Sequence, residues 1–199
     1  MIEANARNLT ALSKQVHEAA KAKGFWEGEQ NTGQKFMLII SEVGEAMKAH
    51  RKGHFVNIEA FDKSCPISIL DMVEQSGFCK SIFTVCFTNY IKDSFEDNLA
   101  NILICVLDFV GSLDIVIDDF VPDIGELCGE TNIGAMLFDA CEYIVQAHVS
   151  VQYNSDDRNI SERMQFVLRH VFAIAKYFNI DIARHIKLKL LYNKTIQTW

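Results

Sequence analysis

The chain has 199 residues, 49% of them hydrophobic, and a formal net charge of -7 at pH 7. This apolar content is enough to build a core and argues against a disordered chain. The acidic balance argues against a protein whose main task is to neutralise nucleic-acid phosphates, because that task needs a basic surface. Only two prolines interrupt the chain, which favours long helices. We therefore expect an all-α protein that forms an antiparallel helix bundle and has no nucleic-acid partner.

The six cysteines contain no C-x-x-C pair, and several lie within apolar runs. This distribution is typical of reduced, buried thiols and argues against a disulfide framework or a zinc site. The first residues show no basic segment followed by an apolar one, so no secretory signal is predicted. The most apolar long stretch, residues 99–117, is interrupted by Asn101, Asp108 and Asp114, which would be costly in lipid. We predict a cytoplasmic protein with no membrane partner.

The first predicted element is an amphipathic helix over about residues 5–23, which ends at Gly24. A glycine-rich loop over residues 24–33 follows and carries Trp26. Two interpretations of Trp26 stay open. The side chain either anchors the loop to the core or forms the wall of a pocket on which a nucleobase stacks.

A helix is predicted within residues 35–53, where it is stopped by Gly53. Its buried stripe is predicted from apolar residues at three- and four-residue steps: Phe36, Ile40, Val43 and Met47. Glu42 and Glu45 are three residues apart, so their carboxylates lie about one helical turn apart on one side. Two like charges this close invite a divalent cation between them. The alternative is a solvated helix face on which Glu45 pairs with Lys48.

Residues 55–89 are harder to interpret. Two short helices, over 68–75 and 81–91, are possible, but residues 82–88 are also rich in strand-forming side chains. Both interpretations stay open.

A second strong helix is predicted from Ser94, a natural N-cap, to about Leu113. One side of this helix is a continuous apolar stripe. A buried helix rarely carries polar side chains without partners, so those on its other side must be explained. They are Asp97, Asn98, Asn101 and Asp108.

Three more helices are predicted over about 134–150, 161–178 and 181–194. Two segments in this part of the chain weakly echo earlier ones, which suggests a pseudo-symmetric bundle with residues 134–199 as a second helical half. The echoes pair residues 138–143 with 41–46 and residues 171–182 with 106–117.

The sequence resembles the MazG-like, all-α nucleoside triphosphate pyrophosphohydrolase superfamily, which includes the dimeric dUTPases. The resemblance rests on residues 23–26, on 40–46 followed by 51–53, on 90–110, and on 179–182 followed by 189–193. It implies one domain over residues 1–199, with 55–89 as an insertion, and a homodimer or larger homo-oligomer. It also implies Mg²⁺, or Mn²⁺ in its place, held by an E-x-x-E on one helix and an E-x-x-D on the next.

The resemblance assigns Glu42 and Glu45 as catalytic residues and metal ligands. Asn98 stands where the second motif has Glu, and Asn101 where it has Asp. An amide oxygen can coordinate a cation, but two negative charges are lost. Asp97 is a further candidate ligand, and Asp108 shares its side of the helix.

The resemblance further implies substrate contacts from three residues, in addition to the candidate Trp26 of the loop: Lys189, Tyr192 and Asn193. The alternative for the last three is a closing amphipathic helix that exposes its lysines.

The first hypothesis for function is a Mg²⁺-dependent pyrophosphohydrolase that converts a nucleoside triphosphate to the monophosphate and pyrophosphate, with an altered metal site. Such an enzyme would act in nucleotide-pool cleaning. The second hypothesis is a catalytically inactive relative that binds a nucleotide or a partner protein without turnover. The third is a structural helical module in which Glu42 and Glu45 are surface residues.

Overall fold

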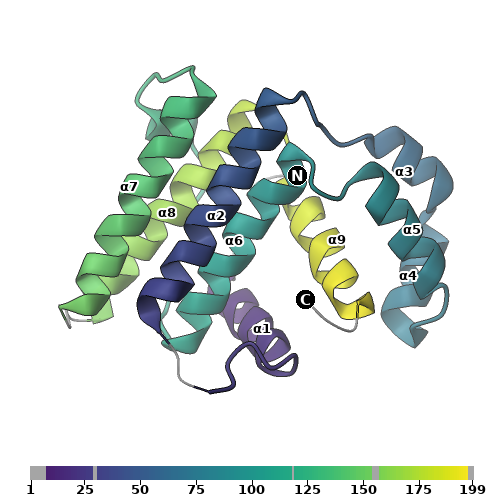
Figure 1. Cartoon of the computed structure of the whole chain (residues 1–199), viewed down its shortest axis with the longest axis horizontal. Helices are drawn as coiled ribbons and strands as arrows, with labels where there is room; N and C mark the ends of the chain where they lie inside the picture. The colour runs from purple at the N-terminus through teal and green to yellow at the C-terminus, as the bar shows by residue number, and fades with distance from the viewer. Residues whose placement is uncertain (1–7, 29–30, 118, 154–156, 197–199) are drawn as a thin grey trace.

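The computed structural model describes residues 8–28, 31–117, 119–153 and 157–196 (Figure 1). These residues form helices joined by turns, with no strand among them, so the prediction of an all-α bundle is confirmed. The α-helices are α1 Leu9–Lys21, α2 Thr32–Arg51, α3 Ile58–Ser64, α4 Ile67–Ser76, α5 Lys80–Tyr90, α6 Phe95–Ser112, α7 Ile133–Gln152, α8 Asp157–Tyr177 and α9 Ile182–Thr195, and a short 3₁₀ helix, η2, spans Ile124–Leu127.

Helix α6 is the central element of the bundle. It packs against α1, α2, α8 and α9, while α7 lies against α2 and α8 (Figure 1). Its first six residues are all buried, polar ones included, and its apolar residues continue the burial to Val110. Ser94 caps the helix by accepting a hydrogen bond from the backbone N–H of Asp97 at 3.2 Å, as the sequence predicts. A helix so placed must satisfy every polar side chain with groups from its neighbours.

The segment over residues 55–89 forms an arm of three helices, α3 to α5, beside the bundle (Figure 1). A second hydrophobic cluster holds the arm together around Phe61, Phe83 and Phe87, and it includes Leu191 and Tyr192 of α9. The strand interpretation of residues 82–88 is wrong. The segment is helical because its large apolar side chains recur at three- and four-residue steps, which places them on one face.

The buried face of α2 differs from the predicted stripe. Phe36 and Val43 are buried as expected, but Met47 is 37% exposed. The helix is turned by about one residue, so that small side chains face the core and let the neighbouring helices approach. The buried residues are Phe36, Ile39, Val43, Ala46 and Ala49.

Helices α1 and α6 approach closely at Gly111. A Cβ atom at this position would collide with the backbone carbonyl of Ser13 and come within 2.7 Å of the Cβ of His17. Glycine therefore permits the contact that brings one turn of α1 onto the polar side of α6.

No helix in the described ranges combines the length and the apolar character needed to cross a bilayer. The six cysteines all lie within those ranges and are unpaired, as predicted. Cys65 and Cys86 are buried, and Cys128 is exposed.

Candidate functional site

A pocket of about 240 Å³ lies where α1, α2, α6 and α9 meet. Three of the predicted site residues line it: Trp26 from the loop after α1, Glu42 from α2, and Asn193 from α9. The volume is below the roughly 300–1,000 Å³ of pockets that enclose drug-sized ligands, so it suits a single ring system better than a whole triphosphate. The remaining lining is mostly apolar, with one further acidic residue, Asp108, and three lysines: Lys23, Lys35 and Lys194.

The carboxylate of Glu42 is partly buried and bonded to α6. Its Oε2 accepts a hydrogen bond from Nδ2 of Asn101 at 2.9 Å. Burial raises the pKa of Glu42, and the hydrogen bond from Asn101 acts in the opposite direction. Glu42 and Asn101 are the pair, among the four positions of the two expected acidic motifs, that the fold connects by a direct hydrogen bond.

Asp97 is neutralised by a cation from the chain itself. Nζ of Lys189 lies 2.9 Å from Oδ2 of Asp97, and the two side chains are only 7% and 1% exposed. The backbone N–H of Asp93 donates to the same oxygen at 3.0 Å. Burial raises the pKa of Asp97, while the Lys189 ammonium and the N–H of Asp93 oppose that rise. Lys189, the predicted substrate contact, and Asp97, the predicted metal ligand, are thus bound to each other in one buried ion pair.

Asn98 is used within α6 rather than in the pocket. It is buried, and its Nδ2 donates to the backbone carbonyl of Asp93 at 3.3 Å. This bond secures the turn that precedes the helix. The asparagine at this position therefore has a structural partner, as does Asn101 through Glu42.

Trp26 anchors its loop and also forms part of the pocket wall. Its Nε1 donates to both oxygens of Asp108, at 3.0 and 3.1 Å, and the ring packs against the main core. Nζ of Lys35 lies 4.0 Å from the ring centroid, a cation–π contact. Trp26 therefore anchors the loop and also lines the pocket, as the two interpretations from the sequence described. A base could stack on the indole face that Lys35 covers only if Lys35 moved.

His17 joins this cluster without any signal in the sequence. Its Nδ1 lies 2.9 Å from Oδ1 of Asp108, and its ring meets Trp26 edge to face with centroids 4.8 Å apart. Burial raises the pKa of Asp108, and the hydrogen bonds from His17 and Trp26 lower it. Only the close approach of α1 to α6 at Gly111 places His17 there.

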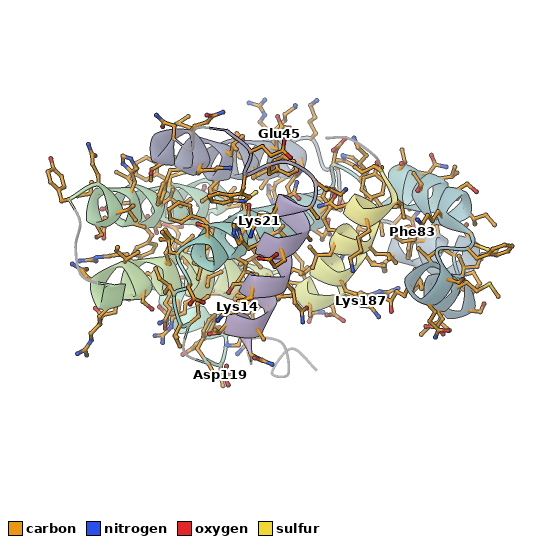
Figure 2. All side chains as sticks on the ribbon, turned by 90° about the horizontal axis from the view of Figure 1, so that it is seen from below. Lys14, Lys21, Glu45, Phe83, Asp119 and Lys187 are labelled. Atoms are coloured by element: carbon orange, nitrogen blue, oxygen red, sulfur yellow. The ribbon has the colours of Figure 1, made fainter. Side chains whose placement is uncertain are left out.

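Six predicted site residues do not line the pocket: Asp97, Asn98, Asn101 and Lys189, described above, and Glu45 and Tyr192. Glu45 is on the outer surface of α2 (Figure 2), where its Oε2 is 2.8 Å from Nζ of Lys48. This is the ion pair that the alternative interpretation expected. Tyr192 belongs to the arm cluster, where its ring stacks on Phe87 at a centroid distance of 4.3 Å.

Asn193 lines the pocket and carries a buried hydrogen-bond acceptor without a partner among the described residues. The residue is only 7% exposed, and its Oδ1 has no hydrogen-bond partner in the described part of the chain. A buried acceptor left without a donor is costly, so a donor group of a ligand or a water molecule would be favoured here.

The residues present fit a divalent cation only on the α2 side. Glu42 accepts a hydrogen bond from the amide nitrogen of Asn101, so the amide would have to turn over to offer its oxygen to a shared cation, and Glu45 could join them after leaving Lys48. Mg²⁺ is often held by one or two carboxylates, with waters and substrate phosphates completing its coordination. Within the described ranges no group of three or more acidic, histidine or cysteine side chains is arranged to hold a metal ion. Mg²⁺ or Mn²⁺ binding stays a prediction.

Comparison of the chain with protein-family models, with curated proteins and with solved structures finds no match. The resemblance to the MazG-like superfamily rests on the motif residues alone.

Proposed function

We propose that the protein binds a nucleoside phosphate without hydrolysing it, with the base in the pocket between α1, α2, α6 and α9. The observation that carries this proposal is the buried ion pair of Asp97 with Lys189. Oδ2 of Asp97 is taken by Lys189 and by the backbone N–H of Asp93, and the side chain, only 1% exposed, does not line the pocket. With Asn98 and Asn101 in place of the other expected acids, Glu42 is the one motif carboxylate that lines the pocket.

The pocket wall supplies the contacts that such a ligand needs. The aromatic face of Trp26 offers a stacking surface for a base. Lys35 and Lys194 carry the positive charge that attracts phosphate oxygens. Because Lys35 has a flexible stem, a phosphate group can draw its amino group away from the indole ring and expose that ring to the base.

Mg²⁺-dependent hydrolysis is the second candidate function. It is favoured by the position of Glu42 at the pocket, one helical turn from Glu45. When bound, a divalent ion would neutralise the phosphates and lower the pKa of a coordinated water. Glu42, Glu45 and Asn101 are the residues of this chain that would hold it.

The test combines binding and turnover on the same protein. Isothermal calorimetry with ribo- and deoxyribonucleoside mono- and triphosphates is run with Mg²⁺ and with a chelator, and pyrophosphate release is measured in parallel. We expect binding in both conditions without pyrophosphate release. Lys194→Gln should weaken binding about tenfold, or about 1.4 kcal/mol. The matched control Lys52→Gln removes an exposed lysine beyond the pocket and should leave affinity unchanged.

Two outcomes would contradict this proposal. Pyrophosphate release that Glu42→Gln abolishes would establish the second candidate. A complete lack of heat with every nucleotide, with no thermal shift in either condition, would leave the structural-module hypothesis.

A further inference from the structure

A second and larger hollow lies on the other side of α9. This groove, of about 750 Å³, is formed by α1, α4, the α4–α5 turn and α9, and it shares Gln15, Leu190 and Lys194 with the pocket. Figure 2 shows Lys187 on α9 between α1 and the arm. Neither the motif residues nor the proposed nucleotide site account for this groove.

One long face of α9 lines the groove. Its apolar residues Ala183, Ile186 and Leu190 and its basic residues Lys187 and Lys194 recur at three- and four-residue steps. From residue 183 to residue 194 the face is about 16 Å long, or about three helical turns. The groove therefore has the length and the mixed lining to receive one helix.

The opposite walls repeat this pairing of apolar and basic side chains. Leu12 of α1 and Val73 of α4 contribute apolar surface, and Lys80 at the start of α5 contributes a third lysine. One carboxylate also lines the groove, that of Glu74, which lies 2.9 Å from Nζ of Lys187. The groove thus carries an excess of positive charge, although the chain as a whole has a net charge of -7.

We propose that this groove binds an acidic amphipathic helix of a partner protein. Helix-in-groove recognition places an apolar stripe at i, i+3, i+4 and i+7 against an apolar floor. Lys187 and Lys194 are about 10.5 Å apart along α9, two turns of helix, so they match carboxylates seven residues apart on the partner. Complementary charge on the rims selects an acidic helix over a basic one.

The proposal is tested with two synthetic peptides of about four to five helical turns. Both carry leucines at i, i+3, i+4 and i+7. One has glutamates on its flanks, including a pair seven residues apart, and the other has lysines at the same positions. Fluorescence anisotropy should show at least tenfold tighter binding of the acidic peptide, with affinity falling as salt is added.

A matched pair of variants locates the binding. The double variant Lys80→Glu, Lys187→Gln lowers the charge of the groove and should weaken binding of the acidic peptide at least tenfold. The control Lys63→Glu, Lys52→Gln makes the same charge change at exposed lysines outside the groove and should leave affinity unchanged. Lys194 is left intact because it also lines the nucleotide pocket. Circular dichroism confirms that both variants keep their helices.

Three results would overturn the proposal. The first is equal affinity for the two peptides, and the second is no binding of either. The third is a dimer in sedimentation that the groove variant alone dissociates, since a second copy of the chain would then occupy the groove.

Discussion

Replacing Lys189 by Met tests the buried ion pair with Asp97, on which the proposal of binding without hydrolysis rests. The change keeps the apolar stem but removes the ammonium 2.9 Å from Asp97, whose side chain is 1% exposed. Breaking a buried pair in this way typically costs about 3–5 kcal/mol, because a charge is left buried without a partner. That is a large share of the roughly 5–15 kcal/mol by which domains are usually stable. Urea unfolding followed by helical circular dichroism measures the loss.

The double variant Asp97→Asn, Lys189→Met separates electrostatics from packing. It removes both charges and keeps an oxygen that can still accept from the N–H of Asp93. We expect it to recover most of the stability lost in Lys189→Met, to within about 1–2 kcal/mol of wild type. A Lys189→Met variant that loses less than about 1 kcal/mol, or a double variant no better than the single one, would refute the assignment of a buried, charged pair.

Two further predictions concern packing and pH. Gly111→Ala should destabilise the protein by about 1–3 kcal/mol because the new Cβ collides with the backbone of Ser13. Gly44→Ala is the control in an open helical site and should stabilise by up to about 1 kcal/mol, so equal urea midpoints would refute the close approach of α1. For buried His185, burial lowers the pKa to about 4 from the ordinary value of 6.5. The folded state therefore binds fewer protons than the unfolded state between these values, and roughly 3 kcal/mol of stability present above the upper value is lost as pH falls to the lower one. His185→Leu should reduce the change in unfolding free energy between these pH values, measured by urea unfolding at several pH values. An unchanged pH dependence would contradict a buried neutral imidazole at His185.

Helix α6 shows what could be predicted from the sequence. Its N-cap at Ser94, its apolar stripe and its polar side all follow from local spacing, and the structure confirms each of them. The sequence also required that Asp97 and Asp108 find partners, because buried charge is costly. It could not name those partners, His17 and Lys189, since each comes from a helix distant in the chain.

The arm over residues 55–89 was open in the sequence because short apolar runs suit a strand and a helix equally well. From their three-residue spacing alone, Glu42 and Glu45 were equally good candidates for a metal site. Tertiary packing distinguished them, since α2 turns Glu42 toward α6 and the pocket and leaves Glu45 beside Lys48 at the surface.

The sequence by itself determined the all-α class, the approximate helix bounds outside the arm and the need to satisfy the polar side of α6. These follow from periodicity, capping and the cost of burying charge, which act over a few residues. Only the tertiary structure decided that Lys189 neutralises Asp97, that Trp26, Glu42 and Asn193 share one pocket, and that a basic groove opens beside α9. Such contacts depend on how helices distant in the chain rotate and cross, and no local pattern encodes that geometry.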